Sequence, residues 1–365
     1  MRTRLTGTFS LVIVALVALV SSCASRQAAT IVSANLIVAK LGSGLMNQDV
    51  RPGPGVDEIR WLSDYQPSLL GSPGDSLVYI MDSGKPGGTL LVVGGTHANE
   101  LAGMTAATLL VERAVPTGGR LIVIPHLNSS GLSYMDTVNP QPSWIRLEAA
   151  SGTRYLQYGS RLVHPEHQGR VDPDRYFLPD SPDSLAGSEQ RNINRAYPGI
   201  EEGPLTQRVA KAVMDIIVRE KVSLALDMHE ARPSSKLKWM IVANPKNLDL
   251  AINTVFDLED KGILLKIDQS SDEFRGLSHK EWGDRTEAMA FLVETVNPAQ
   301  EPRVGEPVDQ LGHPEYPLWR RVGVQLETLG AIVGNYNAVS SDGTILYDGI
   351  PSLEEIEAQG LEAFF

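Results

Sequence analysis

The sequence predicts an α/β fold in which a parallel or mixed β-sheet is covered by helices on both faces. Six short apolar runs are typical of strands, and longer stretches with helical spacing of apolar residues lie between them. Strands that alternate with helices of this length indicate such an architecture. The chain has 365 residues and an apolar content of 42%, which suits one large domain or two small ones.

The elements follow one another along the chain in a regular order. The strands are expected at residues 76–81, 89–93, 121–125, 222–228, 238–243 and 289–294, and the helices at 101–114, 204–221 and 247–262. The helix at 204–221 has a proline in its first turn and apolar residues on one face, which predicts packing against the sheet. Residues 132–190 contain six prolines and little periodicity. We expect this region to be either a lid with short elements of its own or an insertion.

The N-terminal residues predict export. A basic start is followed by an apolar stretch, Phe9 to Val20, that is too short for a comfortable membrane span. The segment resembles a bacterial lipoprotein signal, so we expect a signal peptide over residues 1–22 and lipidation of Cys23. Cys23 is the only cysteine, so no disulfide can form within the chain. An ordinary signal peptide or an uncleaved anchor is the alternative.

The residues after the cysteine indicate where the protein is located, and its net charge limits the classes of partner that it can bind. By resemblance to the sorting of Gram-negative lipoproteins, Ala24-Ser25 implies an outer-membrane lipoprotein that faces the periplasm. The formal net charge of −12 argues against a nucleic-acid partner, which requires clustered Lys and Arg. It does not exclude an anionic small substrate, because a few arginines can set the local field.

Side chains at two expected strand ends predict a metal site. His97-Ala98-Asn99-Glu100 joins an apolar strand to an expected helix, and its imidazole and carboxylate can point at one divalent ion, for which we expect zinc. A catalytic zinc usually takes a third protein ligand from a distant strand. His229 meets that need, because it follows the strand expected at 222–228, at the end where open α/β sheets bind ligands.

Two further features accompany these ligands. Arg195 could hold a substrate carboxylate through paired hydrogen bonds, with Asn194 beside it and Tyr197 before a Pro-Gly turn. Glu294 ends an apolar strand, where its carboxylate would be well placed as a base. The other histidines are expected to be structural or exposed, with His279 and His313 in loops.

The order of these motifs resembles the zinc carboxypeptidase superfamily, and within it the succinylglutamate desuccinylase and aspartoacylase branch. The resemblance covers roughly residues 75–321 and rests on His97-x-x-Glu100, Asn194-Arg195-x-Tyr197-Pro198-Gly199, Asp227-x-His229-Glu230 and Glu294. It implies a three-layer α/β/α fold with a mixed central sheet of about eight strands. It also implies a catalytic domain over 71–330, between an N-terminal segment at 23–70 and a C-terminal extension at 331–365.

The resemblance also implies roles for the motif residues. One zinc ion would be held by His97, Glu100 and His229, while Glu294 would act as general base and acid. The substrate carboxylate would be held by Asn194, Arg195 and Tyr197. For the arginine that steadies the oxyanion, Arg175 is preferred over Arg191.

Two positions depart from the family pattern. Ala98 stands where the family usually has glycine, and Asn192 stands where an aspartate is common. Neither change removes a metal ligand, so the expected activity is kept and the specificity is open.

The function expected from these features is zinc-dependent hydrolysis of an amide bond next to a free carboxylate, in an N-acyl amino acid or a short peptide. A carboxypeptidase for cell-wall peptides is the alternative, because desuccinylases normally work in the cytoplasm and this chain carries an export signal. A third reading is a non-catalytic binding lipoprotein on the same fold.

Overall fold

A mixed eight-stranded β-sheet forms the centre of the protein. The structure is a computed structural model that describes residues 49–135, 143–301 and 307–365. The signal peptide and Cys23 lie outside these described residues. Within them, no helix combines the length and the apolar character required to span a membrane.

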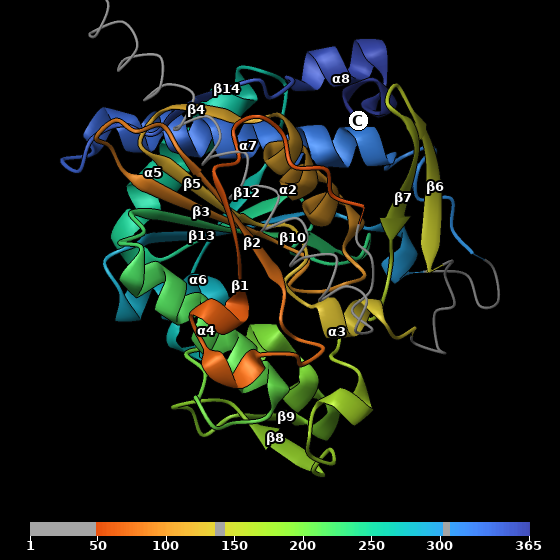
Figure 1. The fold of residues 1–365 in the computed structure, drawn as a ribbon, viewed down its shortest axis with the longest axis vertical. Coiled ribbons are helices and arrows are strands. Elements are labelled where there is room, and N and C mark those ends of the chain that lie inside the picture. The colour runs from red at the N-terminus through yellow and green to blue at the C-terminus, as the bar shows by residue number, and fades with distance from the viewer. Residues whose placement is uncertain (1–48, 136–142, 302–306) are drawn as a thin grey trace, which may run out of the picture. The chain divides into compact units, whose positions relative to one another are not determined.

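The strands of the sheet run in the order β1-β2-β5-β3-β10-β13-β11-β12 (Figure 1). Neighbours from β5 to β13 are parallel, whereas β1, β2 and β11 pair antiparallel with at least one neighbour. All six predicted strands belong to this sheet, and the α/β fold class with a mixed sheet is confirmed. The strands are β1 (Glu58–Trp61), β2 (Leu77–Asp82), β3 (Thr89–Gly94), β5 (Arg120–Ile124), β10 (Leu224–Ala231), β11 (Met240–Ala243), β12 (Lys266–Gln269) and β13 (Met289–Val296).

Helices cover both faces of the sheet, as Figure 1 shows. One apolar cluster joins the sheet to α2 (Leu101–Arg113), α5 (Leu248–Glu259) and α7 (Leu318–Val339), and the other joins it to α4 (Leu205–Arg219) and α6 (Ser278–Arg285). Successive side chains of a strand alternate between faces. In β10, Leu224, Leu226 and Met228 therefore face α2 and α7, while Ala225 faces α4 and α6.

The C-terminal part of the chain continues this fold. The boundary expected at residue 330 falls inside the single helix α7. Beyond it, β14 (Leu346–Asp348) pairs with β4 (Val115–Gly118), and α8 (Leu353–Gln359) packs on α7. Sequence reasoning missed α7 because its buried side includes Arg321, Gln325 and Thr328, which interrupt the apolar stripe that marks a packed helix.

The described residues of the region at 132–190 include two antiparallel hairpins. One is β6 (Trp144–Ala149) with β7 (Gly152–Gln157), and the other is β8 (Arg175–Phe177) with β9 (Ser184–Ala186); the short α3 (Ser129–Leu132) leads into this region. Leu147 and Leu156 of the first hairpin pack into the cluster beneath α2 and α7. The region therefore has short elements of its own, and its role as a lid stays a prediction.

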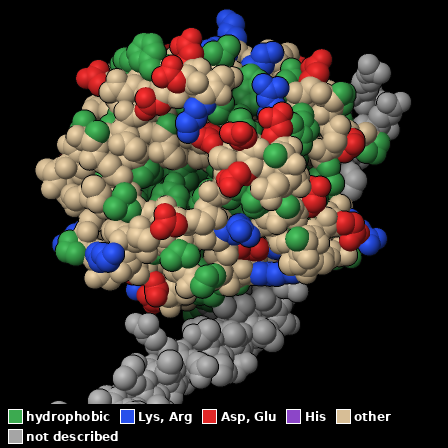
Figure 2. All heavy atoms as spheres, turned by 90° about the horizontal axis from the view of Figure 1, so that it is seen from above, with side chains coloured by type: hydrophobic (Ala, Val, Ile, Leu, Met, Phe, Trp, Pro, Cys, Tyr) green, Lys and Arg blue, Asp and Glu red, His purple; other side chains and the backbone are tan. Residues whose placement is uncertain are grey.

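The surface carries charges of both signs. Figure 2 shows acidic and basic side chains interspersed on the face seen from above, with apolar side chains between them. The net charge of −12 is thus not gathered into one acidic area on this face.

A buried arginine joins the first hairpin to α2 and to the segment before β1. The side chain of Arg154 on β7 is 2% exposed and forms ion pairs with Asp49 and with Glu112 at the end of α2, at 3.0 and 2.6 Å. Its guanidinium also lies 4.9 Å from the centre of the Phe365 ring. Because the Glu112 carboxylate is largely removed from water, it depends on Arg154 for compensation of its charge, whereas Asp49 also pairs with Arg51.

Replacement of this arginine should therefore destabilise the fold. Arg154→Met leaves Glu112 without its charged partner and Asp49 with only the more exposed Arg51, and we expect the free energy of unfolding to fall by about 3 kcal/mol. The matched control is Arg146→Met on β6, whose ion pair with Glu148 is exposed and should contribute less than about 1 kcal/mol. Urea denaturation of both variants measures the difference, and equal losses would contradict this account of the hairpin.

Candidate metal centre

Two neighbouring parallel strands bring the predicted ligands together. Met228 of β10 lies opposite Gly94, the last residue of β3. The chain then turns through Gly95, whose φ of +66° is a conformation that glycine adopts without strain, and reaches His97. His229 follows Met228 within β10, so the two imidazoles lie at the same edge of the sheet.

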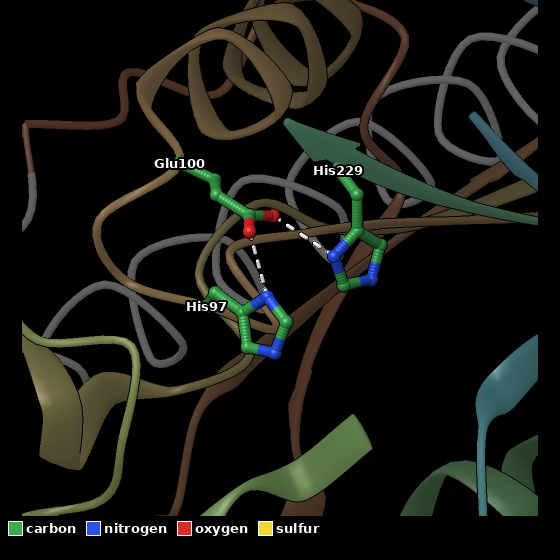
Figure 3. Close-up of side chains that lie close together, drawn as sticks. All are labelled: His97, Glu100 and His229. Atoms are coloured by element: carbon green, nitrogen blue, oxygen red, sulfur yellow. Dashed lines mark hydrogen bonds and ion pairs between the residues drawn. The ribbon is translucent and has the colours of Figure 1, made fainter. Parts of the chain in front are cut away.

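Glu100 lies between the two histidines (Figure 3). Its Oε1 is 2.7 Å from Nδ1 of His97 and its Oε2 is 2.8 Å from Nδ1 of His229. One ligand atom from each of the three residues can be chosen so that all lie within 4.8 Å of one another. Among the described residues, no other group of three or more His, Cys, Asp or Glu side chains has the arrangement to hold a metal ion.

Hydrogen bonds from other segments fix the tautomer of His97. Asn192 donates from Nδ2 to Glu189, and its Oδ1 accepts from the backbone N–H of Asn194. The same Oδ1 lies 2.9 Å from Nε2 of His97 and can only accept there, so Nε2 carries the proton. The Nδ1 lone pair of the neutral ring then faces the carboxylate of Glu100.

This arrangement fits a metal cation. Burial, together with the charge of Arg161, outweighs the opposing effect of Glu100, so the pKa of His97 is lowered and its neutral form is favoured. A lone pair and a carboxylate oxygen 2.7 Å apart repel unless a metal ion or a proton lies between them. Two imidazole nitrogens and one carboxylate oxygen are a donor set that zinc accepts in catalytic sites, with a fourth position left for water.

His229 is set in a more acidic environment than His97. Burial opposes its protonation, but the carboxylates of Asp227 and Glu100 outweigh burial and raise its pKa well above the usual value. Asp227 Oδ2 lies 2.9 Å from Nε2 of His229, although neither atom has a partner in hydrogen-bond geometry. A carboxylate beside the outer nitrogen of a ligand histidine is a common feature of zinc sites.

Helix α7, on the other face of the sheet, bonds to the part of β10 around His229. Glu230 donates its N–H to Oε2 of Glu100, and its own carboxylate pairs at 2.6 Å with the fully buried Arg321 of α7. Gln325 of α7 donates to the carbonyl oxygen of His229. Side chains of α7 therefore hold the part of β10 that carries His229.

Glu294 faces the same side of the sheet as His229. The two residues are paired across β10 and β13, and the side chain of Glu294 is buried. Its Oε2 has no hydrogen-bond partner. Burial and the charge of Glu100 raise the pKa of Glu294 to about 8. A carboxyl with a raised pKa next to a potential metal site has the properties of a proton-transfer group.

Two arginines lie beside these groups. Arg195 is near enough to Glu294 for the carboxylate to raise its pKa, although burial and Arg161 outweigh this effect and lower that pKa to about 10. The charge of Arg161 also contributes to lowering the pKa of His97. Arg161 pairs with Glu189 at 2.5 Å. No motif surrounds Arg161, so sequence reasoning had no signal for it.

Other predicted site residues lie elsewhere. The Oδ1 of Asn194 accepts from the backbone N–H of Ser278, which fixes the start of α6. Tyr197 is fully buried, with its ring against Trp282 at 5.5 Å, so it packs in the core and is not open to a substrate.

The two arginines considered for the oxyanion are both committed to other partners. Arg175 is exposed on β8 and donates to Ser184 on the paired strand. Arg191 donates to Asp172 and to the carbonyl oxygen of Val163. The structure brings neither of them to the metal ligands.

His279 is a correction to the sequence analysis. It was expected in a loop, but it lies buried in the short helix α6, where its Nδ1 bonds to Ser270. Burial and the charge of His229 lower its pKa to about 3. The helix was missed because six of its eight residues are polar or charged, including a buried Glu281.

Comparisons with known proteins yield similarity at the level of structure only. No family model and no curated protein matches the chain. Solved structures to which it is similar include a tripeptide-bound cell shape determinant, Csd4, from Helicobacter pylori (13% identity, TM-score 0.47, covering 75% of this chain and 56% of that one). Others are an aspartoacylase family protein from Mesorhizobium loti (17%, 0.40, 71% and 61%) and a succinylglutamate desuccinylase from a Silicibacter species (13%, 0.45, 84% and 74%).

The names of the last two proteins are those of the branch that the motif order resembles. The match spans less than two thirds of the Csd4 and aspartoacylase chains. At these identities and TM-scores the similarity carries no conclusion about chemistry, so the function is argued from the side chains.

Asn192 is expected to be important for metal affinity although it touches no metal. Asn192→Ala frees His97 to change tautomer and orientation, which should weaken zinc binding by about 10- to 100-fold. Asn192→Asp keeps an acceptor for Nε2 but replaces the donor to Glu189 with a second carboxylate oxygen, so it should bind zinc more tightly than the alanine variant and less tightly than the unchanged protein. Competition with a chromophoric chelator measures these affinities. Equal zinc affinity in the alanine variant would contradict the assigned tautomer.

Proposed function

We propose that this protein is a zinc-dependent hydrolase that cleaves an amide bond next to a free carboxylate, in an N-acyl amino acid or a short peptide. The observation that carries the proposal is the convergence of His97, Glu100 and His229, in which a neutral imidazole faces a carboxylate at 2.7 Å. A metal ion or a proton between these two atoms makes the contact favourable, and the three side chains are ligands that zinc prefers.

The neighbouring side chains supply the remaining roles. A bound zinc ion provides Lewis acidity and a water of lowered pKa. In its ionised form, Glu294 accepts a proton from the attacking water at Oε2 and delivers it to the leaving amine. Arg195 and Arg161 attract the substrate carboxylate and orient the amide bond toward the metal ligands. Asn192 keeps His97 in the tautomer that can bind metal.

A carboxypeptidase that acts on cell-wall peptides is the second candidate. The export pattern at residues 1–22 favours it, because wall peptides are found outside the cytoplasm. Both reactions use the same proton transfers and the same carboxylate recognition, so turnover of N-acyl amino acids must be compared with turnover of wall-derived peptides. A binding lipoprotein without catalysis would turn over neither.

Zinc and Glu294 should be separately required for hydrolysis. A chelator, or His97→Ala, should remove both zinc and activity from the mature protein. Glu294→Gln should keep zinc and lower kcat by about 100-fold or more, because only the proton-transfer group is lost.

The matched control is Glu287→Gln, just before the same strand, where the side chain is exposed. Metal content by mass spectrometry and amide hydrolysis by product analysis give the two readouts. A His97→Ala protein that retained full zinc would refute the assigned ligands.

We propose further that the protein is held in the cell envelope by a lipid on Cys23, in the outer membrane facing the periplasm. The basic start, the short apolar stretch and the single cysteine support this. In Gram-negative bacteria that express the gene, labelled fatty acid should enter the protein, and Cys23→Ser should abolish labelling. Labelling of the serine variant would exclude this anchor.

A further inference from the structure

Arg161 and Arg195 share one internal carboxylate, that of Glu189. Oε1 of Glu189 pairs with Nη1 of Arg161 at 2.5 Å, and Oε2 lies 3.9 Å from Nε of Arg195. Asn192 donates to the same Oε2 at 2.8 Å. The carboxylate thus lies where it interacts with both guanidinium groups.

This carboxylate is held firmly in its charged form. Glu189 is on a short helical turn, Gly187–Arg191, and its side chain is only 20% exposed. Burial opposes ionisation, but Arg161 and Asn192 outweigh burial and lower its pKa to about 2. At neutral pH the cluster therefore contains two guanidinium charges and one carboxylate charge.

The cluster is also connected to the metal ligands. Asn192 bonds to Glu189 through Nδ2 and to His97 through Oδ1, so the guanidinium of Arg161 is linked to His97 by three successive hydrogen bonds. A substrate carboxylate bound by these arginines would lie beside the metal ligands. It would also lie beside Glu189, which already uses part of the hydrogen-bonding capacity of Arg161.

The hydrogen bonds left over are limited. One N–H of Arg195 donates to the carbonyl oxygen of Asn194 at 2.7 Å, and the charge of Glu294 also acts on the same guanidinium. A guanidinium binds a carboxylate best through two parallel N–H groups. Glu189 compensates one of the two guanidinium charges of Arg161 and Arg195. The other positive charge is left for a single carboxylate of the substrate.

We propose that Glu189 is a specificity-determining residue that restricts this site to substrates with one carboxylate near the scissile amide and disfavours dicarboxylates. The inference rests on the proposed function for its substrate class. A second carboxylate would meet the charge of Glu189 without a free guanidinium to compensate it, and juxtaposed like charges oppose binding.

The test compares two probes that differ by one carboxylate, N-acetyl-L-alanine and N-acetyl-L-glutamate, with N-acetyl-L-alaninamide as the probe that has none. Calorimetric titration of the chelator-treated protein measures binding without turnover. The unchanged protein should bind N-acetyl-L-alanine more tightly than either other probe. Equal binding of the amide, or tighter binding of N-acetyl-L-glutamate, would overturn the proposal.

The decisive variant is Glu189→Gln, which removes the charge at nearly the same volume. The ratio of the two Kd values should shift by about tenfold toward the dicarboxylate. Glu189→Asp keeps the charge and should keep the preference of the unchanged protein. Glu148→Gln, on the exposed face of β6, controls for a general change in net charge and should shift nothing.

Failure of the proposal can be distinguished from failure of the proposed function. An unchanged ratio in a folded Glu189→Gln protein overturns the role of Glu189, whatever the turnover. If the ratio shifts while the zinc-loaded protein hydrolyses no amide, the role of Glu189 stands and the hydrolase proposal fails. If Glu189→Gln does not fold, the three-probe comparison in the unchanged protein decides the matter.

Discussion

The carboxylate of Glu100 between two buried imidazoles is the constraint on which the rest of the site depends. Removing three ionisable groups from water is unfavourable unless their charges are compensated. The fold brings a turn after β3 and the interior of β10 to the same edge of the sheet, where Glu100 contacts both rings, and a cation held between these side chains would compensate the charge of the carboxylate. The neighbouring arginines and Glu294 then act within the field of this group.

Much of the fold could be predicted from the sequence because its central strands are continuous apolar runs, which parallel strands buried on both faces require. Edge strands gave no such signal. β12 reads Lys-Ile-Asp-Gln and is half exposed, so its composition resembles a loop. Likewise, α6 and α7 bury charged and amide groups such as Arg321 and Glu281, and periodicity of apolar residues does not detect helices of this kind.

The site shows the same division between what spacing reveals and what it cannot. His97 and Glu100 are neighbours in sequence, and His229 ends a clear strand, so strand-end reasoning brought all three to one edge. Arg161 and His279 come from segments with no recognisable pattern and reach the site only through tertiary packing. Arg175 is the opposite case, because the sequence around it suggested a site residue but forms an exposed hairpin.

The clamp that α7 applies to β10 links the ligands to the C-terminal third of the chain. Arg321 and Gln325 bond to Glu230 and to the carbonyl of His229 from beneath the sheet. If α7 unfolded, the backbone of His229 and the Glu230 N–H that bonds to Glu100 would lose this support. A metal ion held by these residues would therefore also stabilise α7, a helix that it would not touch.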